Sequence, residues 1–374
     1  WKYPIQLGWY NCYAFGNGVE SDRVRDDFNA PQIDNGVKVS TTFSGYTEEH
    51  IGSGMIYSGL YNSMSQVNNL NEFNAAEKIT KDLNPAYGSI QALKTRDTDV
   101  VVLAEDKILK VLANKDALYN ADGNPQLTAT DRVLGTAVPF VGDYGISKNP
   151  ESLAWDQFRM YFTDMQRGAV LRLSRDGLTP ISNVGMKTYF REQLPKCSSL
   201  LGTYDVVNGE YNLTLDFGFG SGETSKTISF NEASKGWVSF KSFVAQAGGS
   251  TGGKYITAID YNIYEHHHAD ETTYGNFYGT QHEASIKVLF NDMPGSVKSF
   301  KTINYEGTQA QIDEFTTEAV NMYDSDGNIA PYNITDKEFY NLLPKSGWYA
   351  PEFKTDMQTG FVREFINKEN KWFN

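Results

Sequence analysis

The chain has 374 residues, with 33 Lys and Arg against 46 Asp and Glu and a formal net charge of -13. Its basic residues form no cluster that could follow a phosphate backbone, so specific nucleic-acid binding is not expected. It also has no run of 18 apolar residues, so no membrane segment is expected. Tyr (23), Phe (22) and Gly (33) are abundant, a composition that suits strands and tight turns.

The first predicted helix lies in "NLNEFNAAEKITKDLNP" (69–85). Asn71 is a candidate N-cap, apolar residues follow at spacings of three, and Pro85 comes just beyond the end. A second predicted helix lies in "SNVGMKTYFREQLP" (182–195), with Ser182 or Asn183 as the cap and Pro195 as the stop. Both are expected to lie outside the sheets.

Hairpins dominate the predicted structure. Asx-Gly dipeptides, which accept positive φ at little cost, indicate turns at 35–36, 122–123, 176–177, 208–209 and 326–327. Alternating or continuous apolar residues predict three hairpins, at 99–113, 158–174 and 202–217. Further strands are predicted at 226–230, 237–244, 255–259, 262–266, 284–290 and 297–303.

The stretch "KGWVSFKSF" (235–243) has apolar residues on both predicted faces. With strict alternation, Val238 and Phe240 face one neighbour, while Trp237 and Phe243 face another. We therefore predict an inner strand whose structural core is Trp237, Val238, Phe240 and Phe243.

The predicted fold is all-β and mainly antiparallel, β-propeller-like, with a few short peripheral helices. A two-sheet sandwich or two smaller β domains are the alternatives. We expect a β-rich domain over residues 1–345 and the start of a following module over 346–374.

Because the sequence lacks an initiator Met, we expect a fragment of a longer chain. Cys12 and Cys197 are expected to be free buried thiols.

The histidine-rich stretch "YEHHHADE" (264–271) is the sharpest local motif. On a strand, His266 and His268 would share a face, and Asp270 could complete a metal site. The alternative is a polar turn after a strand, and it is favoured because no spaced partner motif is present. No metal and no cofactor are therefore expected.

Motifs for nucleophilic catalysis and dinucleotide binding are missing from the sequence, and no catalytic residue is predicted. The acidic stretch "YDSDGNIAPYN" (323–333) departs from the calcium-loop pattern. A pair of carboxylates could serve glycan hydrolysis, but spacing alone selects no pair among 46 acids.

Three long stretches are distinctive: "TRDTDVVVLAEDKILKVLANKDALYNADGN", "VPFVGDYGISKNPESLAW" and "NFYGTQHEASIKVLFNDMPGSVKSFKTINYEGTQ". They resemble segments of large virion structural proteins of tailed phages, especially contractile-tailed phages of cyanobacteria. A weaker similarity, mainly in "GAVLRLSRDGLTPIS" and "KGWVSF", extends to tail stabilisation or nozzle-type proteins of short-tailed and crAss-like phages.

The resemblance implies a non-enzymatic component of a phage tail or neck. Its expected partners are other virion proteins, in a homo-oligomeric ring or another symmetric assembly, and its expected location is the virion, assembled in the host cytoplasm. The alternative is a receptor- or glycan-binding module on the tail, for which clustered exposed Tyr and Trp near loops would be the discriminating feature.

Overall fold

The computed structural model describes residues 50–71, 73, 79–96, 99–119, 125–268, 274–309, 315–316, 333–334, 341, 347–350, 352–360, 362 and 364–374. The chain divides into two compact units, the first ending at Ser285 and the second beginning at Ile286. Each unit is described by itself. Cys12 and residues 323–332 of the acidic stretch lie outside the described residues.

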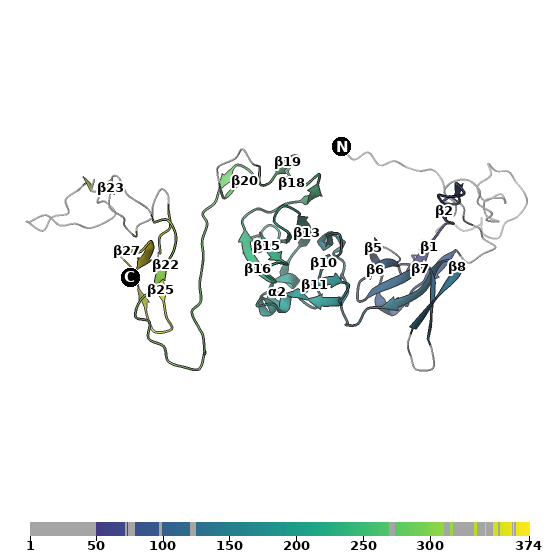
Figure 1. The fold of residues 1–374 in the computed structure, drawn as a ribbon, viewed down its shortest axis with the longest axis horizontal. Helices are drawn as coiled ribbons and strands as arrows, with labels where there is room; N and C mark the ends of the chain where they lie inside the picture. The colour runs from purple at the N-terminus through teal and green to yellow at the C-terminus, as the bar shows by residue number, and fades with distance from the viewer. Residues whose placement is uncertain are drawn as a thin grey trace, which may run out of the picture. The chain divides into compact units, whose positions relative to one another are not determined.

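The first unit contains four successive antiparallel sheets, in each of which the strands lie side by side in sequence order (Figure 1). The first sheet comprises β5 (Ile90–Arg96), β6 (Asp99–Ala104), β7 (Ile108–Tyr119) and β8 (Pro125–Pro139). The second comprises β9 (Ala154–Trp155), β10 (Met160–Asp164), β11 (Ala169–Ser174) and β12 (Gly177–Pro180). The third comprises β13 (Ser199–Asp205), β14 (Glu210–Asp216), β15 (Lys226–Asn231) and β16 (Gly236–Lys241), and the fourth β17 (Ala247–Thr251), β18 (Lys254–Ile259) and β19 (Asn262–Glu265).

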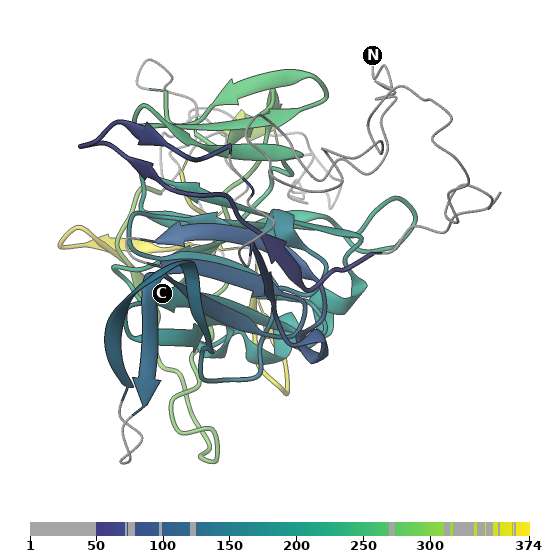
Figure 2. The same ribbon diagram turned by 90° about the vertical axis from the view of Figure 1, so that its right-hand side faces the viewer.

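Smaller pairs of strands flank these sheets. They are β1 (Gly54–Ile56) with β4 (Thr80–Asp82), β2 (Tyr61–Asn62) with β3 (Val67–Asn68), and β20 (Asn276–Phe277) with β21 (Thr280–Gln281). The strands β7 and β8 are longer than their neighbours and extend beyond the first sheet as a two-stranded ribbon (Figure 2).

The helical segments of the first unit are short. They are α2 (Lys187–Gln193) and the 3-10 turns η2 (Pro85–Tyr87), η3 (Pro150–Ser152), η4 (Ile181–Asn183) and η5 (Leu194–Lys196). The predicted helix at 182–195 thus exists in shortened form. In the predicted helix at 69–85, the last part is instead the strand β4, because Lys81 pairs with Met55 of β1 and Leu83 enters an apolar cluster with Val102 and Leu109.

The sheet β9–β12 is buried on both faces. Met160, Phe162 and Leu171 enter one apolar cluster with Val101 and Leu103 of the first sheet. The side chains that alternate with them enter a second cluster with the third sheet and α2, which contains Tyr161, Val170, Phe190, Tyr211, Leu213, Ile228 and Phe230. Every residue of β10 is buried, as expected of a strand between two sheets.

The first strands of successive sheets are neighbours. β13 contacts both β9 and β17, and Lys94 of β5 lies over the ring of Trp155 of β9. The prediction of a mainly antiparallel β fold with few short helices is confirmed. Over the described ranges the sheets close into neither a barrel nor a complete ring, so the propeller-like arrangement stays a prediction.

The second unit is held by pairing between residues far apart in the sequence. β22 (Asn304–Tyr305) pairs with β28 (Lys371–Phe373), which also pairs with β27 (Ile366–Lys368). Two further pairs are β23 (Phe315–Thr316) with β24 (Asn333–Ile334) and β25 (Phe353–Lys354) with β26 (Thr359–Gly360). The predicted division into 1–345 and 346–374 stays a prediction; its dividing point lies between β22 and β28, two strands that pair with each other.

Two predicted strands of the second half do not form. Residues 284–290 and 297–303 are extended but pair with no described strand. Their sequences have the alternation and the β-branched residues of strands, so what they lack is a neighbouring strand.

The strand β16 differs from the predicted alternation because it contains a β-bulge. Phe230 is opposite Trp237 and Ile228 is opposite Phe240, so Trp237 and Phe240 lie on the same face, and Val238 is the extra residue. Val238 is 45% exposed and Phe240 is 57% exposed, so the predicted burial of these two side chains is wrong. Phe243 lies beyond the strand and is buried in a separate cluster with Tyr255.

Trp237 anchors this edge of the third sheet. Its ring centroid lies 4.6 Å from that of Phe190 and 5.3 Å from that of Phe230. Its Nε1 donates to the carbonyl oxygen of Ile181, 3.1 Å away. The ring therefore joins β16 to α2 and η4, in place of the second neighbouring sheet that was expected.

We expect Trp237→Ala to lower the free energy of unfolding by about 3 kcal/mol, because it removes a large aromatic packed against a core. Phe240→Ala, on the same strand and face but more than half exposed, should cost less than about 1 kcal/mol. Urea unfolding followed by far-ultraviolet circular dichroism measures both values. Equal losses in the two variants would contradict the assignment of Trp237 as the anchor.

Candidate functional site

The three consecutive histidines have different surroundings. The ring of His266 is packed among aromatic rings, with centroids 4.9 Å from both Phe243 and Tyr255, and its Nε2 lies 2.7 Å from Oγ1 of Thr257. His268 is exposed, and Asp270 lies outside the described residues. Among the residues that the structure describes, no three side chains of His, Cys, Asp or Glu gather in an arrangement that could hold a metal ion.

The middle histidine, His267, is bound to a buried carboxylate. Its Nε2 lies 2.8 Å from Oδ2 of Asp205, whose side chain is fully buried. The other oxygen of Asp205 accepts from the backbone N–H groups of Val207 and Asn208 in the turn between β13 and β14. His267 therefore fastens the end of β19 to this turn, which is a structural role that the sequence motif alone did not indicate.

Burial lowers the pKa of His266 to about 4, and the nearby His267 acts in the same direction. The folded chain thus holds this imidazole neutral. A neutral ring among aromatic side chains suits a packing role for His266.

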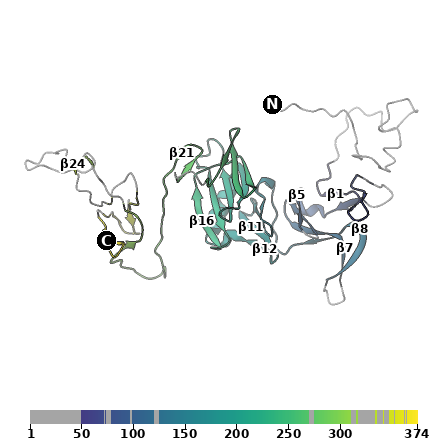
Figure 3. The same ribbon diagram turned by 45° about the horizontal axis from the view of Figure 1, so that its top comes forward.

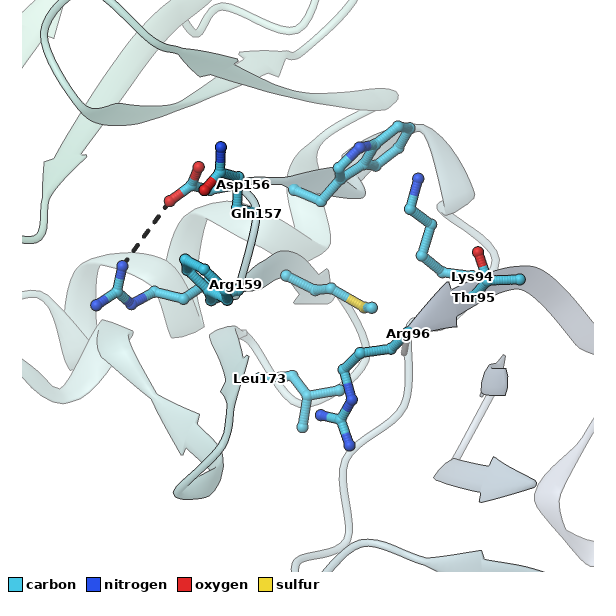
Figure 4. A pocket seen from close by; sticks show the side chains of 10 residues that line it. Lys94, Thr95, Arg96, Asp156, Gln157, Arg159 and Leu173 are labelled. Carbon is cyan, nitrogen blue, oxygen red and sulfur yellow. Dashed lines mark ion pairs between the residues drawn. The ribbon is translucent and has the colours of Figure 1, made fainter. Parts of the chain in front are cut away.

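A small pocket of about 170 Å³ lies between the first two sheets of the first unit. Lys94, Thr95 and Arg96 of β5 form one wall, and the segment from Trp155 to Met160 forms the other, as Figure 4 shows for the labelled side chains. Across the pocket from β5, Asp156 and Arg159 form an ion pair of 3.8 Å (Figure 4).

The rim of this pocket combines exposed aromatic rings with positive charge. Trp155 is 52% exposed and Phe158 is 58% exposed. The ammonium nitrogen of Lys94 lies 3.4 Å from the centre of the Trp155 ring, and the guanidinium of Arg175 lies 5.7 Å from that of Phe158. Within the described part of the chain, neither cation has a carboxylate partner.

The pocket suits binding better than acid–base catalysis. Of the ten residues that line it, Asp156 is the one acid, and it is paired with Arg159. A glycan hydrolase needs two carboxylates on either side of the bond that it cleaves. The pocket thus offers aromatic surface and cations, which can stack on and attract a ligand.

Sequence reasoning missed this pocket, because its walls are about sixty residues apart in the chain and carry no motif. The one usable signal was the pair of aromatics in "AWDQF" (154–158) between two predicted strands. Nothing in the local sequence shows that β5 supplies Lys94 and Arg96 to the same place.

Residues 272–374 match the family model of the crassvirus muzzle protein C-terminal domain. The matched range includes the whole second unit and leaves the four successive sheets outside it. No curated protein matches the chain. The match covers less than a third of the chain, 103 of its 374 residues. None of the described helices is long and apolar enough to cross a membrane.

The lowered pKa of His266 predicts a pH dependence of folding. In the unfolded chain this imidazole takes up a proton near its ordinary pKa of 6.5, whereas in the folded chain burial lowers that pKa to about 4. Stability should therefore fall as the pH falls from 6.5 to about 4, and this loss should be complete below the folded pKa.

We expect His266→Gln to be less sensitive than the wild type to a change from about pH 7 to about pH 5, measured as the shift of the urea unfolding midpoint. His268→Gln is the matched control, since His268 is exposed, and it should keep the wild-type shift. If all three proteins shift equally, the imidazole of His266 is not the group responsible.

Proposed function

We propose that the chain is a non-enzymatic structural protein of a phage virion, held in a tail or neck assembly by contacts with other virion proteins. The match of residues 272–374 to a muzzle protein domain carries this proposal. The earlier resemblance to tail stabilisation and nozzle-type proteins agrees with it. The specific likeness to cyanobacterial phages stays a prediction.

The architecture of the first unit supports an extended scaffold. Four successive sheets, whose first strands are neighbours, have the arrangement of successive blades, so we propose that they form part of a β-propeller-like domain. Stacked sheets of this kind present large surfaces to neighbouring proteins. Copies related by symmetry would then form a ring or a similar closed assembly.

The negative charge of the chain suits a component beside a DNA path. A net charge of -13 repels a polyanion, so passing DNA would not adhere to such a wall. This argument concerns the charge of the whole sequence and assigns no residue to the path.

Immunogold electron microscopy of purified particles, with an antibody raised against this chain, tests the proposal. We expect label at the tail or neck, in every particle that has a tail. Label only at the tips of fibres would favour host recognition instead. Particles that carry no label, in a preparation whose other tail proteins are labelled by their own antibodies, would refute the virion assignment.

A second candidate function is glycan binding, which the pocket beside Trp155 favours. An exposed indole is a platform for sugar rings, and Lys94 and Arg175 would attract an acidic sugar. Under this proposal the ligand is an acidic glycan of the host surface.

On an array of glycans we expect the wild-type chain to bind acidic sugars and Trp155→Ala to lose about tenfold or more in affinity, as for other aromatic anchors. Trp348→Ala is the matched control, because Trp348 is a partly exposed tryptophan of the second unit, 41% exposed. Binding that survives Trp155→Ala, or no binding at all, would exclude this pocket as a glycan site.

A further inference from the structure

The segment from Ile286 to Ile303, here called the arm, exposes an unusual amount of apolar surface. Its sequence is "IKVLFNDMPGSVKSFKTI", and it runs as an extended trace without strands between β21 and β22 (Figures 1 and 3). Exposed fractions of about 60% or more are found for Ile286, Val288, Leu289, Phe290, Met293, Val297 and Phe300. Seven exposed apolar side chains within eighteen residues are more than a protein surface usually carries, and such a concentration marks an interaction site.

The backbone of the arm is unpaired on either side of one tight turn. Ser296 donates its N–H to the carbonyl oxygen of Met293, which closes the turn, and Ile303 pairs with Asn374 at the far end. In the rest of the arm, residues 286–292 and 297–302, no backbone hydrogen bond is made to any residue that the structure describes. The rings of Phe290 and Phe300 lie 6.4 Å apart across the turn.

The arm has a strand-like sequence, and its charge is opposite to that of the whole chain. In a strand, Ile286, Val288 and Phe290 would share one apolar face, and Lys287 and Leu289 would lie on the other. The arm carries three lysines and one aspartate, whereas the whole chain has a net charge of -13. A basic segment of an acidic protein is attracted to other copies of the same protein.

An open sheet edge that fits such a segment lies in the first unit. Three successive sheets have four strands each, whereas the fourth, β17–β18–β19, has three among the described residues. On its outer side β19 pairs with no strand of the described ranges. Ile263 is 76% exposed there and lies between Asp260 and Glu265, of which Glu265 pairs with Lys254 at 2.8 Å. An edge strand with unpaired backbone groups is a template for one more strand.

We propose that the arm of one copy pairs with the free edge of β19 in a second copy of this chain and supplies the fourth strand of that sheet. The proposal rests on the function proposed above, since a virion assembly brings many copies together. Arm and edge are different surfaces, so the contact is head-to-tail and continues from copy to copy until a ring closes. Neither surface pairs with a strand that the structure describes, so both are available to a second copy on assembly.

Sedimentation velocity of the full chain over a range of concentrations, together with hydrogen exchange, tests the proposal. We expect self-association, with slower exchange in 286–303 and in 262–265 as the concentration rises. Val288→Asp places a carboxylate on the apolar face of the arm and opposite an acidic edge. It should weaken association by about tenfold or more. The matched control is Val141→Asp, since Val141 is 94% exposed and belongs to neither the arm nor β19; association should be unchanged.

Three results would overturn the proposal. The wild-type chain could stay monomeric with fast hydrogen exchange in the arm, or Val288→Asp could leave the association unchanged. The arm could also be protected from exchange in the monomer, which would mean that it pairs within its own chain. These outcomes are independent of the virion assignment. If the particles carry the immunogold label but the purified chain stays monomeric, the proposed arm contact is refuted and the proposed function is not. If the purified chain associates through the arm but particles carry no label, the proposed function is refuted and the arm contact is not.

Discussion

The burial of both faces of the sheet β9–β12 is the constraint on which the first unit depends. A sheet with apolar side chains on both faces is stable only between two neighbours, because either exposed face would return a row of large side chains to water. Phe162 faces the first sheet and Tyr161 faces the third, so the two neighbours are specified by alternate residues of one strand. Polar contacts reinforce the same stacking: the hydroxyl of Tyr161 donates to Glu232, which also pairs with Arg172 at 2.9 Å.

Much of this arrangement can be predicted from local sequence. The hairpins at 99–113, 158–174 and 202–217 form where the turn residues and apolar runs place them, because adjacent strands need only short-range information. The bulge at Val238 could not be predicted, since period-two reasoning assumes regular pairing and the extra residue depends on the partner strand. The arm was predicted as two strands because its side chains are those of strands, and no sequence pattern shows that these strands pair with none of the strands that the structure describes.

The candidate sites, too, could be predicted only as far as local sequence determines them. The histidine motif is visible in the sequence, yet its surroundings come from residues elsewhere: Asp205 on β13 binds His267, and Phe243 and Tyr255 enclose His266. The pocket beside Trp155 has no motif, because Lys94, Thr95 and Arg96 come from β5 whereas the rings and the other lining residues come from the second sheet and its loops. Residue types that act together across sheets are separated in sequence by whole hairpins, so composition and spacing carry little information about them.

Because each sheet is built from consecutive strands and packs on the sheet before and after it, the first unit also has a direction of folding. During synthesis the sheet β5–β8 leaves the ribosome before β9–β12, and the second can close on the first while later strands are still being made. Contacts between neighbouring sheets have modest sequence separation, which favours fast folding for a β protein. At each stage the nascent chain exposes one open apolar face, on its newest sheet, and the next sheet to emerge covers it.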